Sequence, residues 1–194
     1  MQIIDNFLPE KDFLEIRNQV LGVGFPWFYI DRVSASEENW INTTDQNCKE
    51  TDGFFNIIIN TQRGYCNPLA QIFDKLFIGL ERIGYKPEDM IICRLSMKFP
   101  KIGFTSETYQ LPHVDLPGKP HDSLIFYLND SDGPTRLFEE FYDGTKQKTF
   151  KVKEYITPVA NRLLKFDGFQ YHTASNPIET SRRVIINLNL HKRK

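Results

Sequence analysis

The chain has 194 residues, of which 40% are hydrophobic, and its 24 Lys and Arg nearly balance 25 Asp and Glu. This length fits one domain with a sizeable core and is too short for two ordinary domains. The balanced charge gives no global field toward nucleic acid or a membrane surface. Neither a signal peptide nor an apolar run near the ~20 residues of a membrane span is present, so we expect a cytoplasmic protein. Three cysteines without metal-ligand spacing argue against a disulfide scaffold or structural zinc.

The first half of the chain is expected to contain helices and loops. Apolar residues recur at helical spacing behind Pro9 and predict a helix over residues 9–21. An aromatic extended stretch follows at residues 26–29. Residues 34–53 are rich in Ser, Asn, Thr, Asp and Glu, which predicts a long loop and a flap. A second apolar stripe of helical period predicts a helix over residues 69–83.

From Met90 onward, short β-type runs are separated by Gly, Pro, Asn and Asp, which is typical of a sandwich or barrel. The expected strands cover residues 91–99, 123–128, 136–142, 149–152, 162–166, 169–172 and 184–190. The predicted architecture is mainly β with helical support (α+β). In it, residues 1–88 supply helical support and substrate-side loops, and residues 89–191 form the β core.

His113, Asp115 and His172 form a candidate metal site. In an extended segment, residues two apart point to the same side, so His113 and Asp115 can reach one ion while Val114 turns away. His172 lies 59 residues further on, which leaves room for strands that return the chain to this point, as in a jelly roll. Two imidazoles and one carboxylate can hold one face of a ferrous ion.

The run from residue 183 to 190 adds a candidate anion-binding residue. Its alternation places Val184 and every second residue after it on an apolar face that helices can cover. Arg183, Asn187 and Asn189 share the opposite face, where the guanidinium of Arg183 can bind a carboxylate with two hydrogen bonds. Arg182 is in the register of the apolar face and is expected to be an ordinary surface arginine.

The ordered set His-x-Asp, distal His, then Arg183 eleven residues later resembles the Fe(II)- and 2-oxoglutarate-dependent oxygenases. It is most similar to small bacterial and phage members like prolyl 4-hydroxylase, and the resemblance covers roughly residues 90–190. The resemblance implies a single oxygenase domain with a double-stranded β-helix (jelly roll) and N-terminal helices. It also implies that O2 and 2-oxoglutarate are consumed and that succinate and CO2 are released.

The same resemblance implies roles for individual residues. The metal ligands of Fe(II) are His113, Asp115 and His172. The proposed contacts to 2-oxoglutarate are Arg183, Tyr109, Tyr127 and Asn187, although both tyrosines equally fit the core. Departures from the family's pattern are Asp132-Gly133-Pro134-Thr135, where Gly-Gly-Glu-Thr is common, and Ile185, where a serine is frequent.

The substrate is left open by the sequence. The leading hypothesis is hydroxylation of a C–H bond in a prolyl or other peptide side chain. Alternatives are the same chemistry on a small metabolite or nucleobase, a catalytically dead oxygenase fold, and a non-catalytic cupin-like binding domain. His121 is interpreted as a loop residue, and the oligomeric state is not predicted.

Overall fold

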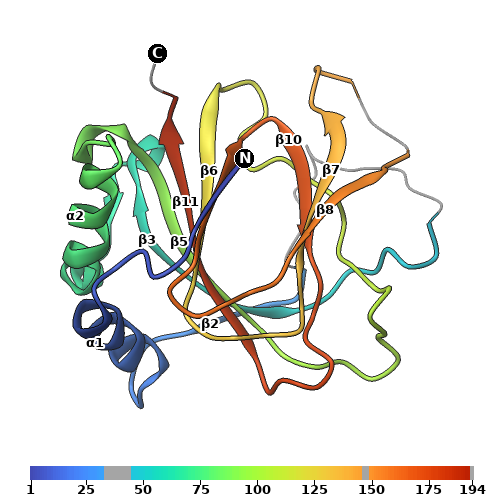
Figure 1. The fold of residues 1–194 in the computed structure, drawn as a ribbon, viewed down its shortest axis with the longest axis horizontal. Coiled ribbons are helices and arrows are strands. Elements are labelled where there is room, and N and C mark those ends of the chain that lie inside the picture. Colours follow the sequence, from blue (N-terminus) through green and yellow to red (C-terminus); the bar gives the residue numbers. More distant parts are fainter. Residues whose placement is uncertain (33–44, 146–148, 193–194) are drawn as a thin grey trace.

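The computed structural model describes residues 1–32, 45–145 and 149–192, which form two antiparallel sheets with helices on one side (Figure 1). The large sheet runs in the order β1 (Gln2–Ile4), β9 (Leu163–Asp167), β6 (His121–Tyr127), β11 (Arg183–His191), β5 (Met90–Lys98), β3 (Gly53–Asn60) and β2 (Phe28–Ile30), with β4 (Tyr65–Cys66) paired to β3. The small sheet runs in the order β10 (Gln170–Ala174), β7 (Thr135–Phe141) and β8 (Val152–Ile156). The predicted mainly β architecture is confirmed, and two such sheets are compatible with a jelly roll.

Helices α1 (Glu10–Leu21) and α2 (Asp74–Arg82) cover one face of the large sheet (Figure 1). In the largest core cluster, Phe13 of α1 and Leu76 of α2 join Val184 and Ile186 of β11. The predicted alternation of β11 is therefore correct, because every second side chain enters this core. The opposite face looks toward the small sheet, where Ile185 and Leu137 belong to a second buried cluster.

The second predicted helix is correct only in its last part. Residues Pro68–Phe73 form a 3-10 helix, η3, and the α-helical geometry begins at Asp74. The Asn67 side chain accepts a hydrogen bond from the Leu69 amide at 2.9 Å and caps this start. Over six residues, periods of 3.0 and 3.6 give nearly the same apolar pattern, so periodicity alone could not separate the two helix types. Two further 3-10 turns are η2 (Thr61–Arg63) and η4 (Pro87–Asp89).

Residues 1–88 supply strands as well as the expected helices and loops. β3 pairs with β5 inside the large sheet, and β1 pairs with β9 near the other edge. The run Gly53–Asn60 is rich in Phe and Ile, a composition that favours a strand, but no strand was predicted between the expected loop and the second helix. Much of that loop, residues 33–44, lies outside the described residues.

The strand expected at residues 149–152 is also displaced. The observed strand is β8, Val152–Ile156, whose three central residues are exposed. It is an edge strand of the small sheet, and its outward charged side chains hid the β pattern. Within the described ranges, none of the helices is long and apolar enough to cross a membrane.

Candidate metal centre and adjoining cavity

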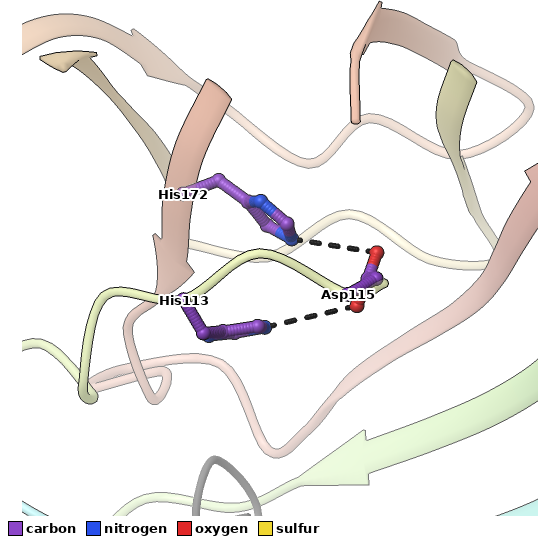
Figure 2. A group of neighbouring side chains, drawn as sticks. All are labelled: His113, Asp115 and His172. Carbon is purple, nitrogen blue, oxygen red and sulfur yellow. Dashed lines mark ion pairs between the residues drawn. The ribbon is translucent and has the colours of Figure 1, made fainter. Parts of the chain in front are cut away.

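The chain brings the three predicted ligands together from two segments (Figure 2). His113 and Asp115 lie between β5 and β6, and His172 lies on β10. The backbones of His113 and His172 exchange two hydrogen bonds, of 2.9 and 3.0 Å, which hold the ring centroids 4.6 Å apart. Val114 turns away into a separate buried cluster, as the extended geometry predicted.

Both imidazoles present the same nitrogen to Asp115. The Nδ1 atoms lie 3.0 Å from the Leu111 carbonyl for His113 and 3.2 Å from the Gln170 carbonyl for His172. A carbonyl only accepts, so each Nδ1 carries the proton and each Nε2 keeps its lone pair. The Nε2 atoms lie 3.9 and 3.6 Å from the Asp115 carboxylate oxygens (Figure 2). The three ligand atoms lie within 4.8 Å of one another, as binding to one ion requires.

The Asp115 carboxylate is oriented by side chains of the large sheet. Asn189 donates to its Oδ2 at 2.9 Å, and Asn187 reaches both oxygens at 3.3 Å. Ser123 donates to Oδ2 at 3.3 Å, and the Arg94 guanidinium lies 3.4 Å from Oδ1. Such partners hold a metal-binding carboxylate in one orientation.

The protonation states also suit a metal. Burial lowers the pKa of His113 to about 3, with a further contribution from His172, and burial likewise lowers the pKa of His172. Burial by itself would raise the pKa of Asp115, but His172, Arg94 and His113 more than offset it, so that pKa is lowered. Neutral imidazoles and an ionised carboxylate are the forms that bind divalent iron.

A cavity of about 230 Å³ extends from the two histidines along the inner face of the large sheet. Arg183 lies in its wall and is only 1% exposed. Its Nε donates to the Gly133 carbonyl at 2.9 Å and its Nη2 to the Thr135 hydroxyl at 2.8 Å. Nη1 has no hydrogen-bond partner among the described residues. A buried guanidinium with a free N–H group fits a carboxylate of a ligand in the cavity.

Two polar residues of the cavity were missed by sequence reasoning. Lys98, at the end of β5, is 4% exposed and lines the cavity with Gln110. A usable signal existed, since Arg94, Ser96 and Lys98 alternate along β5 and therefore share one face. Their meeting with Arg183 depends on the pairing of β5 with β11, which the sequence does not specify.

The predicted tyrosine contacts look different in the structure. Tyr109 packs against Phe138, its hydroxyl donates to Asp45, and it does not line the cavity. The Tyr127 hydroxyl is fully buried and shares a hydrogen bond of 2.7 Å with Thr135. Tyr127 thus contacts a residue that supports Arg183, and the structure brings neither hydroxyl to the cavity surface.

The structure also shows where three other residues discussed in the sequence analysis lie. Asn187 lines the cavity, as predicted, although its amide nitrogen points to Asp115. Arg182 is half-buried and lies outside the cavity lining. The interpretation of His121 as a loop residue is wrong, since it is the first residue of β6 and is fully buried. An added side chain at Gly168 would come within 2.2 Å of its ring.

No protein-family model and no curated protein sequence matches this chain. Solved structures do match it across nearly its whole length. A prolyl-4-hydroxylase from Pseudomonas putida has 16% identity and a TM-score of 0.50, with 98% of this chain and 92% of that chain covered. A viral collagen prolyl hydroxylase from Paramecium Bursaria Chlorella virus-1, in its 2OG complex, has 13% identity and a TM-score of 0.52, with 99% and 96% covered.

The epimerase SnoN, in complex with Fe3+, alpha ketoglutarate and nogalamycin RO, has 10% identity and a TM-score of 0.61. The match covers 97% of this chain and 78% of that one. At 10–16% sequence identity, these structural matches establish the fold of the chain alone. The chain therefore has the fold of the iron- and 2-oxoglutarate-dependent oxygenases, with a His-Asp-His cluster of metal-ligand type inside it.

Proposed function

We propose that this chain is an Fe(II)- and 2-oxoglutarate-dependent dioxygenase that hydroxylates a C–H bond. One observation carries the proposal: two histidines of the His113–Asp115–His172 cluster and buried Arg183, whose Nη1 has no partner among the described residues, line one cavity. The histidine and aspartate ligands suit divalent iron. The Arg183 guanidinium suits the distal carboxylate of a dicarboxylic acid that is also bound to that iron.

The residues of the chain then have defined roles. The Nε2 atoms of His113 and His172 and the carboxylate of Asp115 hold the iron. Arg183 binds the distal carboxylate of 2-oxoglutarate and so orients its 2-oxo end toward the metal. The chemistry that the iron supplies is O2 activation coupled to oxidative decarboxylation of 2-oxoglutarate to succinate and CO2.

For the substrate, we propose a prolyl or other peptide side chain. The cavity wall on the side of β2 and β3 is apolar, with Ile30, Phe55 and Ile57, which suits an aliphatic ring. The same chemistry on a small apolar metabolite fits this wall as well. A cupin-like domain without redox chemistry does not account for a buried arginine without an acidic partner beside the metal ligands.

The test is an anaerobic titration with Fe(II) and 2-oxoglutarate, monitored by the weak visible charge-transfer band of the chelate. The wild-type protein should develop the band, and His172→Ala should bind iron more than about 100-fold more weakly, because even partners that only orient a ligand cost about 10- to 100-fold. His191→Ala is the matched control, since His191 is exposed at the end of β11.

The proposal is wrong if the wild-type protein gives no band, or if His172→Ala gives the same band as the wild type. Under air, the wild-type protein should also convert 2-oxoglutarate to succinate slowly without substrate. Peptides and small molecules can then be screened by their stimulation of succinate release.

A further inference from the structure

Lys98 is a second buried cation in the cavity that contains Arg183. We propose that Lys98 and Arg183 together bind the distal carboxylate of 2-oxoglutarate, one oxygen to each cation. The inference rests on the proposed function and adds a residue that confers selectivity for dicarboxylic 2-oxo acids.

The sheet register brings the two cations together. Lys98 and Arg183 are directly paired across β5 and β11, so their side chains leave neighbouring positions on the same face. The Lys98 ammonium donates to the Gln110 carbonyl oxygen, and Gln110 donates in turn to Asn176 at 2.8 Å. This chain of hydrogen bonds fixes the lysine in the cavity wall, but Gln110 is neutral and supplies no compensating charge.

Neither cation has an acidic partner. Across the described ranges, no carboxylate oxygen lies within 4.0 Å of Lys98 or Arg183. Burial lowers the pKa of Lys98 well below its usual value, the charges of Arg183 and Arg94 lower it further, and the charge of Glu50 raises it. Two buried cations at paired positions with no ion-pair partner within 4.0 Å among the described residues are costly, and an anion between them removes much of that cost.

The available hydrogen-bond donors favour one carboxylate that is shared by both cations over two separate anions. Arg183 uses two of its five N–H donors, one to the Gly133 carbonyl and one to the Thr135 hydroxyl, and its Nη1 has no partner among the described residues. A carboxylate has a second oxygen, which needs its own donor, and the ammonium of Lys98 carries three. A 2-oxo acid without the distal carboxylate would gain nothing from either cation.

The test compares ligand binding to Mn(II)-loaded protein by calorimetry, with 2-oxoglutarate and with pyruvate, which lacks the distal carboxylate. Lys98→Met should bind 2-oxoglutarate about 10- to 100-fold more weakly, the usual range for one charge-assisted hydrogen bond, and pyruvate equally well. Arg183→Leu should show the same selectivity, and Lys86→Met, a change at an exposed lysine, should bind both ligands normally. Without ligand, the melting temperature of Lys98→Met should be no lower than that of the wild type, because an unpaired buried amine has been removed.

A lysine with only a structural role would give another pattern. Lys98→Met would then melt at a lower temperature, or would lose affinity for 2-oxoglutarate and pyruvate equally, and either result overturns the inference. Unchanged 2-oxoglutarate affinity in Lys98→Met, beside a loss in Arg183→Leu, also overturns it and leaves the proposed function intact. If the wild-type protein itself does not bind 2-oxoglutarate, the proposed function fails.

Discussion

Thr135 holds the Arg183 guanidinium together with the Gly133 carbonyl. Its hydroxyl accepts from Arg183 Nη2 at 2.8 Å and shares a hydrogen bond of 2.7 Å with Tyr127, and it is 1% exposed. Thr135→Val keeps the shape and removes the hydroxyl, so two buried polar groups lose a partner. We expect a loss of about 2–3 kcal/mol in the free energy of unfolding, since one of the two groups is charged.

Urea denaturation measures this loss, and Tyr127→Phe is the matched comparison. That variant removes the other hydroxyl of the pair and leaves Arg183 bonded to Thr135, so the cost should be only about 1 kcal/mol. If the two variants were equally stable, the hydrogen bond from Arg183 to Thr135 would contribute nothing to the stability of the fold. Our account of how Arg183 is held in the cavity wall would then be wrong.

The sequence predicted those parts of the site that depend on local periodicity. Alternation along residues 183–190 selected Arg183 and Asn187 for the cavity side, and the His-x-Asp spacing placed Val114 away from the metal ligands. Lys98 and Thr135 reach the cavity only through pairing with distant strands. Their contribution is set by register, which a single sequence does not specify.

Among the elements, the turn before β11 determines how Arg183 enters the sheet, and Asp132 holds that turn. The Asp132 carboxylate accepts from the amides of Ile178 and Glu179 at 3.0 and 2.8 Å, and from the amide and hydroxyl of Thr180. Burial would raise its pKa, but these hydrogen bonds outweigh burial and lower the pKa to about 2.

A lowered carboxyl pKa stabilises the fold above the unfolded value and loses that contribution as the pH falls through the folded value. The stability contributed by Asp132 should therefore be complete above about pH 4 and should disappear between about pH 4 and 2. Because Asp132 is exposed, we expect Asp132→Asn to cost only about 1 kcal/mol at pH 7. Unfolding curves at pH 7 and pH 2.5 measure this, and an equal cost at both pH values would contradict the assignment.

The sequence predicted helices and strands correctly where the periodicity of the apolar residues matched the face that packs in the core. Helix α1 and the central strands β5, β6 and β11 lie within a few residues of their expected limits. The misses have physical causes: η3 has an apolar period too short to distinguish helix types, and β8 is an exposed edge strand. The strand β3 was recognisable from its Phe and Ile content, but its pairing with β5 was not.

At the scale of the whole molecule, Asn161 joins the N-terminal segment to the sheet that carries the site. It adopts a left-handed backbone conformation with φ of 63° and is 2% exposed. Its side chain accepts from the Leu8 amide at 2.9 Å and donates to the Leu8 carbonyl at 2.8 Å, and its backbone carbonyl accepts from Phe7. Leu8 and Phe7 then pack beneath Gly79 of α2.

Two substitutions separate the contributions of Asn161. Asn161→Gly keeps the backbone conformation and leaves two buried groups of Leu8 unpaired, for an expected loss of about 1–3 kcal/mol. Asn161→Ala should lose about 1 kcal/mol more, because alanine resists positive φ. Denaturant unfolding gives both values, and hydrogen exchange at the Leu8 amide should accelerate in both variants. Equal stability of the two variants would show that the left-handed turn carries no strain, and unchanged Leu8 exchange would show that the N-terminal segment is held by packing alone.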